Sequence, residues 1–267
     1  MTSGWTLDDV PWASVDTARV KKREDLFYVV TAASFVESGA DLYTANLVAF
    51  FEDDREIGDW LRGRWQVEEL GHGRVLRDYV RHVWPEFDWQ RAYAAFLADY
   101  GPLCTVDDLE ASRSRELAAR CVVETGTSTF YRALAAQADE PVLAGIANRI
   151  SAQEVDHYKH FYAYFRAYGV RESPGRLEVA TTLARRALEA RNSDAECALR
   201  HAFAVREGEP IDPRRFRDLT TKLGRQLRHD YPAAMAARML IRPLALPSWL
   251  ARSIYGLLAG AITLALR

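Results

Sequence analysis

The chain has 267 residues, of which 49% are hydrophobic, and its formal net charge at pH 7 is −2. This length permits a large buried core, and the small net charge excludes the basic excess that is typical of nucleic-acid-binding proteins. Three widely spaced cysteines without a CxxC pair argue against a disulfide framework and a thiolate zinc site. The first 20 residues show no secretory signal, so we expect a cytoplasmic protein without a nucleic-acid partner.

Apolar residues recur with a helical period along nearly the whole chain, so the sequence predicts an all-α protein. Long helices are expected at residues 24–51, 55–83, 88–99, 106–137 and 140–168, with breaks at EDDRE, WPEFD, YGPLCTVDD and ADEP. Shorter helices are expected at residues 175–191, 194–207, 213–229 and 232–242. The predicted division is an N-terminal arm (1–23), a helical bundle (24–170) and a helical C-terminal extension packed on the bundle (171–267).

The last stretch, residues 244–266, is strongly apolar but is interrupted by Pro247 and Arg252. This leaves about 14 uninterrupted residues, fewer than the roughly 20 that span a bilayer. We expect a final helix that packs on the domain or on a second subunit. The alternative is a helix that lies on a membrane surface, helped by Arg238, Arg242 and Arg252.

Two stretches place a glutamate three residues before a histidine. These are VEELGHG, with Glu69 and His72, and QEVDHYKH, with Glu154 and His157. On a helix, residues three apart share a face, so each pair can direct a carboxylate and an imidazole to one point. About half of one such pair is expected by chance in a chain of this composition, so the pairs alone are a weak signal.

The position across each expected hairpin adds a stronger signal. If the helix of Glu69 folds back at residues 52–54, the residue at equal distance from the turn is Glu37. The same count from the turn at ADEP leads from Glu154 to Glu124. Each site lies about 15 residues from its turn, or about 22 to 24 Å at 1.5 Å per residue, so both hairpins carry these residues at matching depth.

One Glu on each of two helices and Glu-x-x-His on two others form the ligand set of carboxylate-bridged di-iron and di-manganese centres. The predicted metal ligands are Glu37, Glu69, His72, Glu124, Glu154 and His157. Oxygen donors with one nitrogen per metal suit two iron ions, with manganese as the alternative, and the lack of cysteine ligands argues against structural zinc. The competing interpretation is six polar residues on helix exteriors.

These residues resemble the ferritin-like di-iron proteins, and most closely the soluble acyl-carrier-protein desaturases. EELGHG at residues 68–73 is similar to their E-E-x-x-H-G motif, Thr127 follows Glu124 by one turn as a threonine does there, and Trp65 precedes Glu69 by one turn. The resemblance covers about residues 25–168. It implies a ferritin-like four-helix bundle with a di-metal core and additional C-terminal helices.

The chain departs from the family pattern beside three ligands. Gly71 and Asp156 stand where the family places an arginine before each ligand histidine, and Gln153 stands where it places an acidic residue. The groups that orient the histidines must therefore differ, and such groups tune metal affinity and reactivity.

The resemblance implies an O2-dependent di-iron oxidoreductase that acts on a long-chain acyl group, carried by acyl carrier protein or CoA. Glu69 and Glu154 would bridge the two ions, and Thr127, or with less support Ser128, would be the catalytic hydroxyl that hydrogen-bonds bound oxygen or passes a proton. The implied partners are O2, an external electron donor such as ferredoxin, and a second copy of the chain in a homodimer.

Three alternatives remain open. The first is hydroxylation or N-oxygenation of a small metabolite, although Ile150 stands where arylamine oxygenases of the superfamily have an additional histidine ligand. The second is ferritin-type iron oxidation or storage, which predicts a shorter chain. The third is a purely structural helical bundle, in which the six ligands could be replaced by alanine without loss of function.

Overall fold

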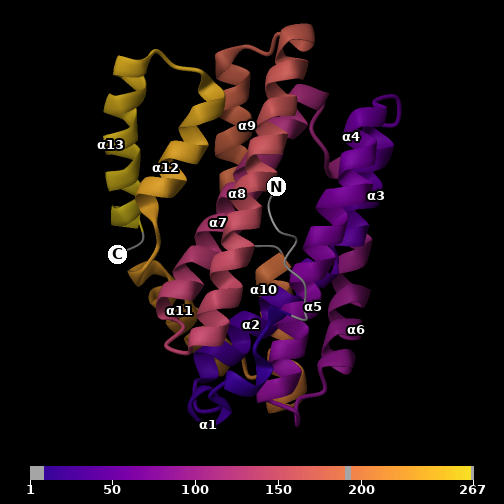
Figure 1. The fold of residues 1–267 in the computed structure, drawn as a ribbon, viewed down its shortest axis with the longest axis vertical. Coiled ribbons are helices and arrows are strands. Elements are labelled where there is room, and N and C mark those ends of the chain that lie inside the picture. The colour runs from indigo at the N-terminus through magenta and orange to yellow at the C-terminus, as the bar shows by residue number, and fades with distance from the viewer. Residues whose placement is uncertain (1–8, 190–193, 266–267) are drawn as a thin grey trace. The chain divides into compact units, whose positions relative to one another are not determined.

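The computed structural model describes residues 9–189 and 194–265, and every regular element within them is helical (Figure 1). The predicted all-α class is therefore confirmed, and the buried carboxylates and histidines are consistent with a ferritin-like bundle. The described residues divide into two compact units: unit 1 has residues 9–107, 138–146 and 194–224, and unit 2 has residues 108–137, 147–189 and 225–265. The division predicted at residues 23 and 170 is a different partition and stays a prediction.

Unit 1 contains most of the N-terminal half of the chain. Its helices are α1 (Thr17–Val20), α2 (Glu24–Ser38), α3 (Ala40–Phe50), α4 (Arg55–Trp60), α5 (Gln66–Val83), α6 (Trp89–Tyr100) and α10 (Asp194–Glu207). Unit 2 contains α7 (Arg113–Gln137), α9 (Arg176–Glu189), α12 (Ala233–Ile241) and α13 (Ser248–Ala265). Two helices cross the division, α8 (Pro141–Glu172) after Ile146 and α11 (Pro213–His229) after Gly224.

The first two predicted helices are each interrupted. Residues 24–51 do not form one helix, because Gly39 (φ −89°, ψ 7°) separates α2 from α3. Glycine has a low helix propensity, and its amide here bonds the carbonyls of both Phe35 and Val36. The fourth predicted helix also starts later than expected, since α7 begins at Arg113 and residues 106–108 form a separate 3-10 turn.

Residues 55–83 contain a π-helix, Leu61–Trp65, between α4 and α5. The buried side chains of Ile57, Leu61 and Trp65 repeat every four residues, and Glu69 continues the series. In an α-helix such a repeat drifts by about 40° per step. The wider π turn compensates this drift and keeps Glu69 on the buried side.

The remaining predicted helices agree with the structure within a few residues. The helices at 194–207 and 213–229 match α10 and α11, and 232–242 corresponds to α12. The helix at 88–99 corresponds to α6, and 140–168 extends to Glu172 as α8. The helix at 175–191 corresponds to α9 as far as Glu189; its last two residues lie outside the described part of the chain.

In unit 1, α2 and α5 pack antiparallel. Phe27 contacts Trp84 edge to face with 5.2 Å between ring centroids, and Ser38 lies against Gly73. α2 is buried on nearly every face, with α10 packed against it in the same unit. A helix that is buried all round needs apolar residues around its whole circumference, which is the composition of α2.

In unit 2, α7 and α8 also pack antiparallel. Ser151 Oγ donates to the Ser128 carbonyl at 2.8 Å, and Arg132 donates to Asn148 at 3.2 Å. Glu140 fixes the turn between these helices: its carboxylate accepts from the amides of Val142 (3.0 Å) and Leu143 (2.8 Å). This cap stands directly before Pro141, a residue suited to the first turn of a helix. The turn predicted at ADEP is therefore confirmed.

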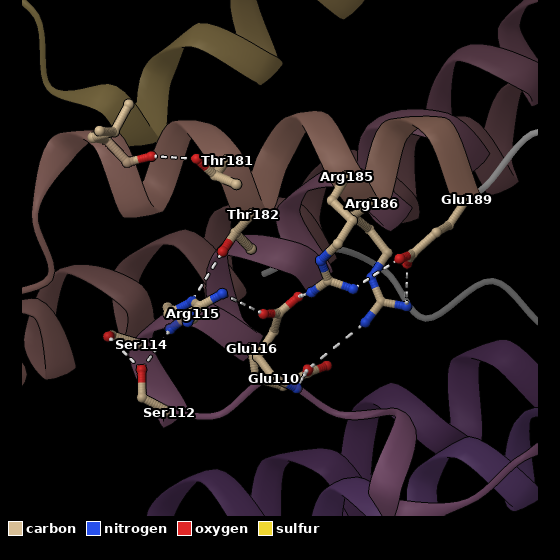
Figure 2. A network of polar contacts seen from close by, with 11 residues as sticks. Glu110, Ser112, Ser114, Arg115, Glu116, Thr181, Thr182, Arg185, Arg186 and Glu189 are labelled. Atoms are coloured by element: carbon tan, nitrogen blue, oxygen red, sulfur yellow. Dashed lines mark hydrogen bonds and ion pairs between the residues drawn. The ribbon is translucent and has the colours of Figure 1, made fainter.

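A buried polar network links α9 to the start of α7 in unit 2 (Figure 2). Glu116 is fully buried and accepts from Arg120 at 2.6 Å and from the Glu110 amide at 2.9 Å. Glu110, also buried, pairs with Arg185 of α9 and with Arg115 (3.1 Å). Burial by itself raises the pKa of Glu116, but Arg120 and the Glu110 amide outweigh it, so this pKa lies below its ordinary value.

The C-terminal helices α12 and α13 lie side by side in unit 2, joined by a turn at residues 242–247 (Figure 1). Arg238 of α12 lies over the ring of Tyr255 of α13, with its guanidinium carbon 5.1 Å from the ring centroid. Arg238 lies three residues before the end of α12 and Tyr255 seven residues after the start of α13, so both are within two turns of the connection and the pair is antiparallel. Among the described helices, none is long and apolar enough to cross a membrane.

Candidate metal centre

Unit 1 brings Glu37 of α2 to Glu69 and His72 of α5, as the hairpin count predicts. All three side chains are buried, and one ligand atom from each lies within 4.8 Å of the others. His72 Nδ1 is 3.6 Å from Glu37 Oε2 and 3.6 Å from Glu69 Oε2. We call this group half-site 1.

Unit 2 contains the corresponding group, Glu124 of α7 with Glu154 and His157 of α8, which we call half-site 2. Its three residues are at most 1% exposed. His157 Nδ1 is 3.7 Å from Glu124 Oε2 and 3.6 Å from Glu154 Oε2, and the three ligand atoms again lie within 4.8 Å. The two half-sites therefore have the same residue types and nearly the same internal distances.

The donor set of each half-site fits a metal cation. Two buried carboxylates whose oxygens lie within 4.8 Å repel each other and have lost their hydration shells. A cation between them offsets this cost in free energy. Two carboxylates and one imidazole per half-site are donors that iron and manganese accept. Burial raises the pKa of the Cys121 thiol, and the charge of Glu124 raises it further. Cys121 is not part of the groups of metal-ligating side chains found among the described residues.

Thr127 touches half-site 2 directly. Its Oγ1 lies 2.9 Å from Glu154 Oε2 and 3.3 Å from the carbonyls of Val123 and Glu124. A hydroxyl has one proton, and the closer, charged carboxylate is its strongest acceptor. Ser128 points elsewhere, with its Oγ 3.2 Å from the Thr125 carbonyl, so Thr127 is the hydroxyl at this half-site.

The other residues of the EELGHG motif differ in what surrounds them. Glu68 accepts from Arg64 at 3.3 Å and is not part of the group of ligand atoms at half-site 1. A side chain at Gly71 would meet nothing closer than Arg74, at 3.7 Å, whereas a Cβ at Gly73 would lie 2.7 Å from the Ser38 amide nitrogen. Our sequence analysis did not single out Gly73, although a glycine directly after a ligand histidine is a signal for close helix packing.

The other histidines lie outside both half-sites. His160 is 3.8 Å from Asp156, His201 is 3.0 Å from Asp99, and His229 is 3.1 Å from Asp230. Asp156, which departs from the family pattern, also lies 3.7 Å from Lys159. None of these groups shares a ligand atom with the clusters of buried glutamate and histidine among the described residues.

Comparison with known proteins gives a distant similarity. No protein-family model matches the chain. Over 111 residues, 39% of this chain, the sequence is 32% identical to a protein named "Putative acyl-[acyl-carrier-protein] desaturase DesA2" in two Mycobacterium tuberculosis strains, CDC 1551 / Oshkosh and ATCC 25618 / H37Rv. The match covers 36% of those relatives, so the chain spans about a third of their length. This similarity indicates a related fold.

Proposed function

We propose that the protein is an O2-dependent, non-haem di-iron oxidoreductase in which half-sites 1 and 2 form one centre. The observation that carries the proposal is the repetition of one buried Glu, Glu, His group on two antiparallel helix pairs. Two such pairs supply the ligands of a carboxylate-bridged di-iron bundle. The distant similarity to a protein named as a desaturase supports the same class.

Four of the six side chains would each bind one iron ion, and the other two would bind both. Glu37 and His72 would bind one iron, Glu124 and His157 the other, and Glu69 and Glu154 would bridge them. When bound, such a centre supplies O2 activation and a strong oxidant for C–H bonds. The chain itself orients the ligands, and Thr127 holds Glu154 by donating to its carboxylate.

The proposed substrate is a long-chain acyl group on acyl carrier protein or CoA. In desaturation, R–CH2–CH2–R′, O2, two electrons and two protons give R–CH=CH–R′ and two waters. The electrons come from an external donor such as ferredoxin. Hydroxylation differs in that one oxygen atom of O2 enters the product and the other leaves as water.

Iron stoichiometry in ligand variants tests the shared centre. The protein is loaded with Fe(II) without oxygen, desalted and assayed for iron per chain, beside His72→Ala, His157→Ala and the control His160→Ala. In one shared centre, either ligand variant loses most of both irons, while His160→Ala retains about two. If each ligand variant retains one firmly bound iron, the half-sites are independent. If the wild type binds less than about one iron, the di-iron assignment is wrong.

A product assay with 18O2 tests the reaction. The iron-loaded protein is reduced by ferredoxin and its reductase in the presence of acyl carriers of several chain lengths. A product two mass units lighter that contains no 18O supports desaturation. A product that contains one 18O atom assigns hydroxylation, and iron oxidation without any substrate product assigns ferroxidase activity.

A further inference from the structure

α13 leaves an apolar face uncovered. Trp249, Leu257 and Leu264 are 65%, 75% and 72% exposed, and they recur at helical spacing along one face. The opposite side of α13 packs on α12 in the same unit. Arg252 is the only charged residue within Ser248–Ala265.

Basic side chains are concentrated in the segment that carries this face. Residues 225–265 contain five arginines and one acidic residue, Asp230, although the whole chain has a net charge of −2. Arg238 is held beside α13 by its contact with Tyr255, and Arg242 lies 4.7 Å from the Tyr162 ring centroid. Both are exposed, and neither they nor Arg252 pair with a carboxylate among the described residues. The segment thus combines exposed apolar area with uncompensated positive charge.

We propose that α13 docks on an anionic membrane surface. Trp249, Leu257 and Leu264 enter the interface between head groups and acyl chains, and the arginines contact anionic head groups. Charge complementarity favours lipid over a second copy of the chain. In a two-fold dimer through this face the same arginines would be brought together, whereas an anionic surface neutralises them.

Vesicle co-sedimentation of the full chain tests this docking. Vesicles of phosphatidylcholine alone are compared with vesicles that also contain phosphatidylglycerol, at low and high salt. We expect binding only to the anionic vesicles, and weaker binding at high salt because salt screens the arginines. Equal binding to both compositions, or none, overturns the proposal.

Substitutions on the exposed face keep the test specific. Leu257→Gln with Leu264→Gln should weaken vesicle binding by at least about tenfold, and Arg238→Gln with Arg252→Gln by about fivefold per arginine. Leu188→Gln at the end of α9 is the matched control, because Leu188 is 64% exposed, whereas the start of α9 contacts the turn before α13 through Arg176 and the Ala245 carbonyl. Unchanged far-UV circular dichroism shows that each variant is folded. Loss of binding in the control to the same extent contradicts a specific role of α13.

Self-association is the competing outcome. Gly256 and Gly260 lie near the exposed face, and a Cβ at either position would meet no other atom within 4 Å, so a second helix could approach there. Sedimentation velocity of wild type and the Leu257, Leu264 double variant distinguishes the two. If the wild type is a dimer that dissociates in the double variant, and the wild type does not bind vesicles, the face belongs to a second copy of the chain. This result overturns the membrane proposal.

Discussion

The hydroxyl of Thr127 directly contacts one of the six predicted ligands, at 2.9 Å from the Glu154 carboxylate. A hydrogen bond to a charged group contributes about 1.5 to 3 kcal/mol to stability, which is more than a hydrogen bond between neutral groups contributes. Donation to Glu154 fixes the rotamer of a carboxylate that the proposal assigns as a bridge. Thr127 is therefore a positioning residue in this state, and its predicted role as a catalytic hydroxyl stays a prediction.

Replacing Thr127 should loosen the metal. Thr127→Val keeps the shape but removes the donor, so we expect iron to be lost to a ferrous chelator at least about tenfold faster. Thr127→Ser restores the donor and should release iron at close to the wild-type rate. Ser128→Ala is the neighbouring control, because Ser128 faces the Thr125 carbonyl instead. Iron retention in Thr127→Val equal to the wild type would show that this hydrogen bond does not hold Glu154.

At the scale of helices, α2 and α5 approach each other closely where the predicted ligands of half-site 1 lie. A Cβ on Gly73 would be 2.5 Å from Ser38 Oγ and 2.8 Å from Ser38 Cα, and backbone atoms cannot yield at low cost. Glu37 and His72 are the residues directly before Ser38 and Gly73, so the spacing of the two helices sets the geometry of half-site 1.

Two glycine substitutions separate helix packing from helix propensity. Gly73→Ala should lower the free energy of unfolding by about 1 to 3 kcal/mol and reduce iron content. Gly71→Ala, which meets nothing closer than 3.7 Å, should be neutral or should stabilise α5 by up to about 1 kcal/mol. Urea unfolding and iron analysis of both variants provide the measurement. Equal behaviour of the two variants would contradict a close approach at Gly73.

The network between α7 and α9 makes a separate contribution to stability at the helix scale. Glu116 is buried among arginines. Removing one partner of a buried ion pair lowers the free energy of unfolding by about 3 to 5 kcal/mol. Its folded-state pKa lies below the ordinary value of 4.5. The carboxylate therefore contributes stability that is fully present above about pH 5 and is lost as the pH falls through the folded-state pKa.

Glu116→Gln should lower the free energy of unfolding by about 3 kcal/mol at pH 7. The difference from wild type should shrink as the pH falls below about 4.5, because the unfolded chain takes up a proton at Glu116 there, while the folded protein does so only at lower pH. Glu189→Gln is the matched control, because Glu189 pairs with Arg185 at 2.7 Å at the surface of the same network. This substitution should lower the free energy of unfolding by less than about 1 kcal/mol. Urea unfolding at several pH values measures both. A constant difference across the pH range would rule out titration of Glu116.

At the scale of the whole molecule, the six predicted ligands are divided three and three between the two units. A metal that binds the folded chain but not the unfolded chain adds to the free energy of unfolding by mass action.

Metal removal should therefore lower the unfolding temperature. With free Fe(II) about 1,000-fold above its dissociation constant, the free energy of unfolding should exceed that of the metal-free protein by about 4 kcal/mol. We expect His72→Ala and His157→Ala each to abolish most of the gain, whereas His160→Ala retains it. Differential scanning calorimetry without oxygen, with iron or with a chelator, measures the effect. A full gain in either ligand variant would show that iron stabilises the chain elsewhere.

The sequence by itself determined the helical class, most helix ends and the pairing of each Glu-x-x-His with a glutamate across a hairpin. These features are local or follow from counting along the chain, because hydrophobic period, caps and turn residues act over a few positions. It did not determine the break at Gly39 or the π-helix at Leu61–Trp65. The π-helix depends on how the buried side chains of Ile57, Leu61 and Trp65 line up, and the low helix propensity of a glycine does not by itself decide whether it interrupts a helix.

The tertiary structure decided which distant residues meet. Only the packed helices bring Ser38 to Gly73, Thr127 to Glu154 and Glu110 to Arg185. The sequence favours Thr127 but leaves Ser128 as an alternative, whereas one step along a helix rotates a side chain by about 100°, so only Thr127 reaches the predicted ligand Glu154. Which face of a helix is buried, and against which partner, is set by packing between segments far apart in the chain, and one sequence read alone does not contain those distances.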